Sequence, residues 1–242
     1  MKKLTPLLTL ALCTLLTPAR AQATPFADGI DAAITGMRAF AGYAFFFKGN
    51  QYLKYNWDTD AVEPGYPAPI AGNWKGFPEA YTNGIDAAVN GQGNSTGFGY
   101  FFKGSGYIKY NWDKDRVEPG YPRPIAGNWK GLPPSFTSGI DAAVNGKTPF
   151  NGSVYLFKGN QYVRYNWIQD RVDPGFPQPI AQYWKGLPAS FGNGIDEVLN
   201  GEGAYRAYAY FFKGNQYARY LWSQDRMDGS DTLPIAGNWR GF

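Results

Sequence analysis

The chain has 242 residues and carries 23 Lys and Arg against 19 Asp and Glu, for a net charge of +4. This near balance gives no support to a surface that binds nucleic acid or an anionic membrane. Histidine is absent and cysteine occurs once. Because the common acid–base and nucleophilic sites are built with these residues, we do not expect an enzyme.

Residues 1–23 have the features of a signal peptide. Lysines at positions 2 and 3 form a basic start, residues 7–16 are apolar but too few to span a membrane, and residues 21–23 (Ala-Gln-Ala) fit a cleavage site. We expect cleavage near Ala23 and a secreted or periplasmic mature chain without a transmembrane segment. Cys13 lies in this segment, so the mature chain can form no disulfide.

From residue 24 onward the sequence repeats with a period of 55 residues. The tripeptide Gly-Ile-Asp recurs four times without insertion or deletion, and two tryptophans keep the same spacing. The aspartates are Asp31, Asp86, Asp141 and Asp196, and the tryptophans are Trp57, Trp112, Trp167 and Trp222, then Trp74, Trp129, Trp184 and Trp239. A period near 50 residues is typical of propellers and solenoids.

The ends of the repeat array favour a closed ring. An open solenoid is expected to carry atypical polar repeats at its ends, and none is visible. The final Gly241-Phe242 aligns with Gly76-Phe77, so the last unit stops where the first begins, and we expect Phe26 to pack against Phe242. The predicted units are residues 26–80, 81–135, 136–190 and 191–242.

Each unit reads as a meander of three strands. In the second unit a short apolar run at 85–89 is followed by aromatic strands at 100–102 and 107–112, with a glycine turn between the last two. A proline-rich loop comes next, and residues 124–129 are best read as a helix of one turn. The second and third strands are apolar on both faces, as in a sheet packed between two others.

The complete unit resembles the hemopexin repeat. It combines Phe-x-x-Gly-Ile-Asp, Tyr-Phe-Phe-Lys-Gly-x-x-Tyr-x-[Lys/Arg]-Tyr-x-Trp and Asp-Pro-Gly-[Tyr/Phe]-Pro-x-Pro-Ile, seen here in residues 191–198, 210–222 and 173–180. The resemblance covers all four units. It implies an all-β, four-bladed β-propeller with one unit per blade, closest in layout to the single-propeller albumin-2 class of seed proteins, and the signal peptide suggests a bacterial secreted member.

The Gly-Ile-Asp aspartates are the candidate metal site. The first strand of each blade lines the central channel of a propeller, so four residues at the same position of the repeat form a ring around the channel. Four carboxylates in a channel repel one another unless a cation lies among them or their side chains turn to cap backbone amides. The resemblance implies an axial ion bound by Asp31, Asp86, Asp141 and Asp196 with backbone groups of Ala33, Ala88, Ala143 and Val198. An oxygen set of this kind suits calcium first and sodium second.

Other repeated side chains are expected to be structural. The tryptophans keep one phase in every unit, which favours packing between blades over stacking on sugars. The lysines at 48, 103, 158 and 213 lie in hairpin turns and are expected to be solvated. The basic residues at 54, 109, 164 and 219 could pair with Asp60, Asp115, Asp170 and Asp225 at the blade edges.

The loops between the first and second strands differ most among the units. All four emerge on one face of the ring, and loops on a rigid scaffold often carry recognition. This face is therefore the candidate ligand platform. Its candidate residues are Met37, Arg38, Phe98, Phe150, Tyr205 and Arg206.

Two classes of function remain open. The resemblance implies either a secreted binder of haem or a polyamine, or an adhesion or protein-interaction module that acts at a cell or host surface. Haem held by two histidines is excluded, so Met37, Tyr205 or Met227 would have to serve as a ligand. We expect a monomer or weak dimer whose partner is a small molecule or an extracellular protein, and no nucleic acid.

Overall fold

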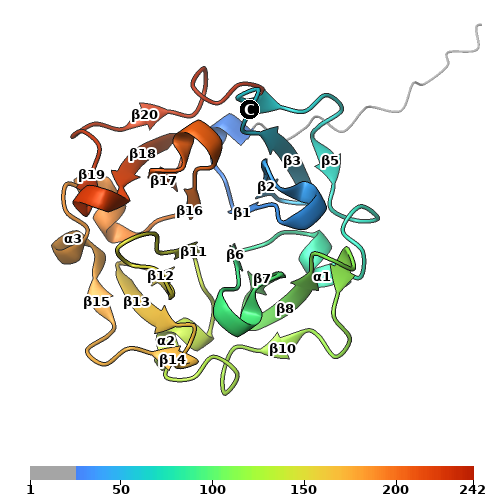
Figure 1. Cartoon of the computed structure of the whole chain (residues 1–242), viewed down its shortest axis with the longest axis horizontal. Helices are drawn as coiled ribbons and strands as arrows, with labels where there is room; N and C mark the ends of the chain where they lie inside the picture. The colour runs from blue at the N-terminus through green and yellow to red at the C-terminus, as the bar shows by residue number, and fades with distance from the viewer. Residues whose placement is uncertain (1–25) are drawn as a thin grey trace, which may run out of the picture.

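A computed structural model describes residues 26–242. Four antiparallel sheets stand around a central axis, with β1, β6, β11 and β16 innermost and the later strands of each sheet farther out (Figure 1). The predicted four-bladed propeller is therefore confirmed. The predicted signal peptide lies outside the described residues.

Each blade has five strands. In blade 1 they are β1 (Ala32–Thr35), β2 (Tyr43–Lys48), β3 (Gln51–Asn56), β4 (Ala61–Val62) and β5 (Ala68–Pro69). In blade 2 they are β6 (Ala87–Asn90), β7 (Phe98–Lys103), β8 (Gly106–Asn111), β9 (Arg116–Val117) and β10 (Arg123–Pro124). In blade 3 they are β11 (Ala142–Asn145), β12 (Ser153–Lys158), β13 (Gln161–Asn166), β14 (Arg171–Val172) and β15 (Gln178–Pro179). In blade 4 they are β16 (Glu197–Asn200), β17 (Tyr208–Lys213), β18 (Gln216–Leu221), β19 (Arg226–Met227) and β20 (Leu233–Pro234).

The three-stranded meander was thus an incomplete prediction. The third strand of each blade also pairs with two short outer strands, one at each of its ends. The outer strands have only two residues each, and prolines lie close to them, so the period of two that reveals longer strands is missing there.

Short helices connect these strands. The α-helical turns are α1 (Glu79–Thr82), α2 (Pro134–Thr137) and α3 (Ile180–Tyr183), and the 3-10 turns are Phe26–Asp28, Arg38–Phe40, Gly93–Ser95, Ala189–Asn193, Gly203–Tyr205 and Trp222–Gln224. The predicted one-turn helix at 124–129 is a hydrogen-bonded turn instead. Gly127 has φ +78° there, a conformation that ends a helix, and in blade 3 Gln182 replaces this glycine and α3 forms.

Aromatic side chains fill the seams, as we call the interfaces between neighbouring blades. In β2, Phe45 and Phe47 pack toward blade 2, whereas Phe46 packs toward blade 4. This alternation follows from the period of two in a strand that is buried on both faces. All eight tryptophans are buried among these rings, in agreement with the structural role expected for them.

The seam between blades 4 and 1 closes the ring. The Phe242 ring lies 4.9 Å from the Phe46 ring and 6.3 Å from the Phe26 ring, measured between centroids. The Val62 amide donates to the Arg240 carbonyl at 2.9 Å, so the C-terminal segment pairs with blade 1 (Figure 1). The expected contact of Phe26 with Phe242 is confirmed.

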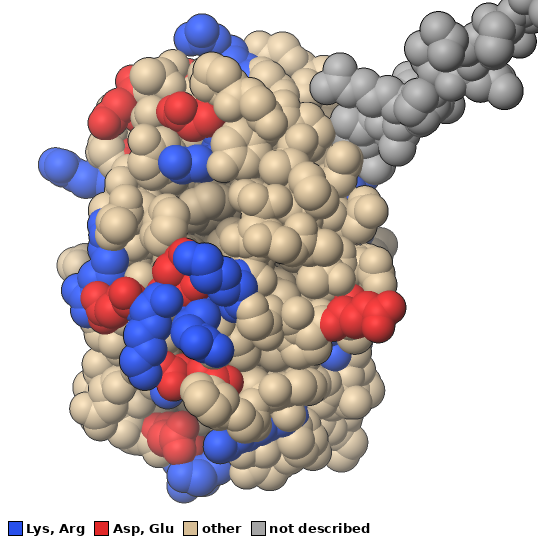
Figure 2. Space-filling view, turned by 90° about the vertical axis from the view of Figure 1, so that its right-hand side faces the viewer, with Lys and Arg blue, Asp and Glu red and all other residues tan. Residues whose placement is uncertain are grey.

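The outer surface mixes charges of both signs. Figure 2 shows acidic and basic groups side by side on the edge that carries blades 1 and 2. Several are paired, as in the ion pairs of Arg38 with Asp113 at 3.0 Å and of Lys114 with Glu118 at 3.0 Å.

The helices of residues 26–242 are all too short to span a membrane.

Candidate functional site: the two mouths of the channel

The four Gly-Ile-Asp aspartates lie at one mouth of the central channel. Each precedes the innermost strand of its blade, and together with Asp28 they line a cavity of about 470 Å³. We call this opening the aspartate mouth. The repeat predicted that these four side chains share one end of the axis, and the structure brings them there.

Their carboxylates bind backbone amides of their own blades. Oδ2 of each aspartate accepts a hydrogen bond from the glycine in the turn between the second and third strands. The pairs are Asp31 with Gly49 at 2.7 Å, Asp86 with Gly104 at 2.7 Å, Asp141 with Gly159 at 2.8 Å and Asp196 with Gly214 at 2.7 Å. Of the two arrangements that relieve repulsion, the structure contains the capping of amides, which fixes each carboxylate in one orientation.

Lysines of the same turns complete this network. Lys103 pairs with Asp86 at 2.7 Å and Lys158 with Asp141 at 2.5 Å. Lys213 donates to the Gly194 carbonyl at 2.7 Å instead. The expectation that these lysines are simply solvated was wrong, because the turn folds back onto the aspartate 17 residues earlier.

The aspartate mouth is not a closed metal cage. No group of three or more acidic, histidine or cysteine side chains within residues 26–242 is arranged to hold a metal ion. A cation at this mouth would therefore depend on a few carboxylate oxygens and on backbone carbonyls or water. The backbone groups expected to contribute, at Ala33, Ala88, Ala143 and Val198, line the channel deeper inside.

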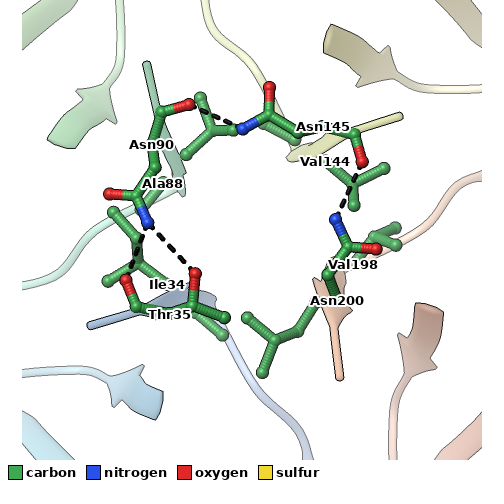
Figure 3. A pocket seen from close by; sticks show the side chains of 12 residues that line it. Ile34, Thr35, Ala88, Asn90, Val144, Asn145, Val198 and Asn200 are labelled. Carbon is green, nitrogen blue, oxygen red and sulfur yellow. Dashed lines mark hydrogen bonds between the residues drawn. The ribbon is translucent and has the colours of Figure 1, made fainter. Parts of the chain in front are cut away.

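The opposite mouth is lined by a ring of amides. Asn90 donates to the Thr35 carbonyl at 2.7 Å, Asn145 to the Asn90 carbonyl at 2.7 Å, and Asn200 to the Asn145 carbonyl at 2.8 Å (Figure 3). The cavity inside this ring is about 30 Å³, enough for one or two water molecules. The asparagines thus join four innermost strands that otherwise belong to separate sheets.

The ring is open at blade 1. Thr35 replaces asparagine there, and no side chain within residues 26–242 continues the chain of bonds from Thr35 to the Asn200 carbonyl (Figure 3). In the other blades the asparagine also accepts from a tryptophan, as Trp112 donates to Asn90 at 2.8 Å. The equivalent Trp57 indole N–H is buried and has no hydrogen-bond partner in the part of the chain that the structure describes.

Glu197 is a buried acidic residue that was not predicted from the repeat. It lies in β16, where the other blades have alanine, and it is fully buried. Neither carboxylate oxygen has a hydrogen-bond partner in the described structure. Burial raises the pKa of Glu197 well above its usual range, while the nearby backbone N–H groups of Ala33 and Val198 act in the opposite direction. The sequence does contain a signal for this residue, because the other three units have alanine at the position of Glu197.

The predicted ligand residues on the loop face have structural contacts of their own. They come from all four loops, and several serve the seams. Phe150 packs against the Trp222 ring at 6.0 Å and Tyr205 against the Trp57 ring at 5.8 Å, while Met37 packs against the core. Arg38 pairs with Asp113, Lys109 lies 3.8 Å above the Phe98 ring, and Arg206 uses its carbonyl to bind Lys147 at 2.9 Å.

The basic residues at the blade edges also pair differently from the prediction. Arg164 binds Asp173 at 2.6 Å and Arg219 binds Asp228 at 2.8 Å. Asp115, Asp170 and Asp225 instead pair with a lysine of the preceding blade. These ion pairs are Lys75 with Asp115 at 2.7 Å, Lys130 with Asp170 at 2.6 Å and Lys185 with Asp225 at 3.8 Å.

Comparison with known proteins agrees with this geometry. The Hemopexin family model matches residues 30–79, 85–134 and 140–189. The chain belongs to the hemopexin family. The fourth blade extends this hemopexin fold beyond the matched segments.

Among curated proteins, matrix metalloproteinase-21 of Xenopus laevis is 29% identical over 203 residues, which cover 80% of this chain and 31% of that protein. The chain thus spans about a third of the length of such relatives. Among solved structures, the hemopexin fold protein CP4 from cow pea has a TM-score of 0.72 at 22% identity, covering 87% of this chain and 95% of that one. A lectin from Cicer arietinum described as having two metal binding sites gives a TM-score of 0.70 at 22% identity, covering 87% and 95%.

Proposed function

We propose that this hemopexin-like protein is a secreted, non-enzymatic binding protein that takes a cationic ligand at the aspartate mouth. The observation that carries the proposal is the convergence of five aspartates on one cavity of about 470 Å³. Four of these carboxylates are fixed by backbone amides, so little side-chain entropy is lost when a cation binds.

The chemistry of the mouth favours two kinds of cation. Its side chains offer carboxylate oxygen and the ammonium groups of Lys48 and Lys103, but neither imidazole nor thiolate. The oxygen ligands suit calcium or sodium better than zinc. The related lectin described as having metal sites is compatible with this assignment. A polyamine is the alternative ligand, since its ammonium groups could bridge carboxylates of neighbouring blades.

Haem has weaker support than either cation. Met227 is buried in the seam between blades 3 and 4, and Met37 and Tyr205 pack against different seams. None of the three is free to ligate iron at one shared surface. Any haemin complex should therefore be weak and lack the spectrum of paired imidazoles.

Titration tests the proposal. We expect calcium chloride or spermine to bind the chelated, dialysed protein stoichiometrically, as measured by calorimetry. At a ligand concentration a hundredfold above Kd, binding should add about 2.7 kcal/mol to the free energy of unfolding and so raise the melting temperature. Asp196→Asn should weaken this binding, whereas Asp113→Asn on the outer edge should not. If chelation leaves the melting temperature unchanged and neither titrant nor sodium is bound, the proposal is wrong. A partner captured from cell-surface extract by a protein with no such ligand would favour the adhesion function instead.

A further inference from the structure

Two seams of the propeller contain clefts built from the same repeat positions. One lies between blades 1 and 2 and the other between blades 4 and 1, and each has a volume of about 140 Å³. We call them the 1/2 cleft and the 4/1 cleft. The 4/1 cleft is lined by the rings of Trp57, Tyr205, Tyr210 and Trp239 and by the charged groups of Asp60 and Arg219.

The carboxylate of the 4/1 cleft, Asp60, forms no ion pair with the described residues. Asp60 accepts a hydrogen bond from the Tyr55 hydroxyl. In the other three blades the equivalent aspartate also pairs with a lysine of the preceding blade, whereas Asp60 has no ion pair with any residue in 26–242. The corresponding residue is Arg240, which donates to the Thr59 carbonyl at 3.4 Å.

The cation of the 4/1 cleft, by contrast, is neutralised. Arg219 binds Asp228 at 2.8 Å. The 1/2 cleft has the reverse arrangement, because its aspartate, Asp115, pairs with Lys75 at 2.7 Å while Lys54 stands 3.7 Å above the Tyr43 ring and has no carboxylate partner in the described chain. Two clefts with the same aromatic walls therefore differ in the sign of the charge that they leave unpaired.

The walls of the 4/1 cleft are suited to a compact organic cation. The Trp57 ring packs against the Tyr205 ring at 5.8 Å, and the Trp239 ring packs edge-on against that of Tyr210 at 5.1 Å, so the aromatic rings line the cleft as contacting pairs. Aromatic faces attract ammonium ions, and a cage of such rings is a recurring way to bind quaternary ammonium groups. A cavity near 150 Å³ admits a molecule the size of benzene, so about 140 Å³ admits an ammonium head group of similar size.

We propose that the 4/1 cleft binds a compact organic ammonium ion, with Asp60 as its counter-ion and Trp57, Tyr205, Tyr210 and Trp239 as the aromatic walls. The site is separate from the aspartate mouth and does not depend on it. The Asp60 carboxylate would repel an anion. A neutral apolar ligand would displace water from this carboxylate without supplying a compensating charge. Tyr205 is specific to this cleft, because the other loops have Phe40, Ser95 and Phe150 at its position.

Choline chloride, followed by tryptophan fluorescence and calorimetry at millimolar concentration, is the probe that tests this site. We expect saturable binding to the full chain, about tenfold weaker binding for Asp60→Asn, and unchanged binding for Asp115→Asn in the 1/2 cleft. Both substitutions remove one carboxylate charge beside a tyrosine hydroxyl, and Asp115→Asn also removes the ion pair with Lys75. The melting temperature of each variant is therefore measured alongside, so that an effect on the ligand is separated from an effect on folding.

A second variant tests an aromatic wall of the cleft. Tyr205→Ser removes one wall but installs the residue that blade 2 uses at this position, so we expect a folded protein with weaker choline binding. Asp196→Asn at the aspartate mouth should leave choline binding unchanged, which separates this proposal from the channel ligand. No saturable choline binding, equal effects of Asp60→Asn and Asp115→Asn, or equal binding of benzoate or methyl glucoside would overturn it.

Discussion

The seam between blades 4 and 1 differs from the other three in its polar groups but not in its packing. All four seams bury the same layer of aromatic rings. Among residues 26–242 only this seam combines an unpaired indole, that of Trp57, with the buried carboxylate of Glu197 and an aspartate, Asp60, without a cross-blade ion pair. The Trp184 indole of the seam between blades 3 and 4 also lacks a partner there. The aromatic layer is thus continuous where blade 4 meets blade 1, although the polar groups there differ from those of the other seams.

The strongest test of this comparison removes the Phe242 side chain, which packs where blade 4 meets blade 1. Phe242→Ala deletes contacts with Phe26, Phe46 and Trp239, so we expect a loss of about 2–3 kcal/mol in the free energy of unfolding. Calorimetry measures the loss, and hydrogen exchange should accelerate first in blades 1 and 4.

Phe77→Ala is the matched control, because Phe77 occupies the same position in the seam between blades 1 and 2. It should cost a similar free energy but accelerate exchange in blades 1 and 2. If Phe242→Ala leaves exchange in blades 1 and 4 unchanged, packing does not close the ring there.

The buried carboxylate predicts a dependence on pH. Because the folded state holds the Glu197 proton more tightly than the unfolded chain does, stability falls as pH rises from the unfolded pKa near 4.5 toward the raised folded value. Glu197→Gln cannot ionise, so in chelator its stability should exceed the wild type by about 1–2 kcal/mol above this interval.

Urea unfolding at about pH 4 and about pH 8 measures this difference. Glu79→Gln, at an exposed position, serves as the control and should not alter the profile. Parallel pH profiles for Glu197→Gln and the wild type would show that the carboxylate is compensated by a group such as a channel cation.

The smallest expected effect comes from repairing the amide ring. Thr35→Asn supplies an amide that can donate to the Asn200 carbonyl and accept from the Trp57 indole, as the equivalent asparagines do. We expect a gain of about 1 kcal/mol in stability and a higher melting temperature. Asn145→Thr removes the hydrogen bond to the Asn90 carbonyl and should lower the melting temperature by a comparable amount. If both variants melt at the wild-type temperature, the amide ring contributes nothing to stability.

The sequence predicted the fold and the position of the candidate site but not the partners of its side chains. A strict repeat fixes which residues are equivalent, so Asp31 and its three counterparts had to surround the axis once the ring closed. Whether their oxygens face a cation or an amide depends on the turn at Gly49, which lies 18 residues away and approaches only when the strands pair.

The period, the aromatic phase and the Gly-Ile-Asp motif by themselves determined a four-bladed ring with aspartates at one mouth. Each of these depends on local pattern, and local pattern decides which face of a strand is buried. Tertiary structure alone decided that Thr35 interrupts a ring of bonds from other blades, and that Asp60 lacks the cross-blade lysine its counterparts have. The physical reason is that these contacts join residues from different blades, whose polar groups meet only after the aromatic seams have packed.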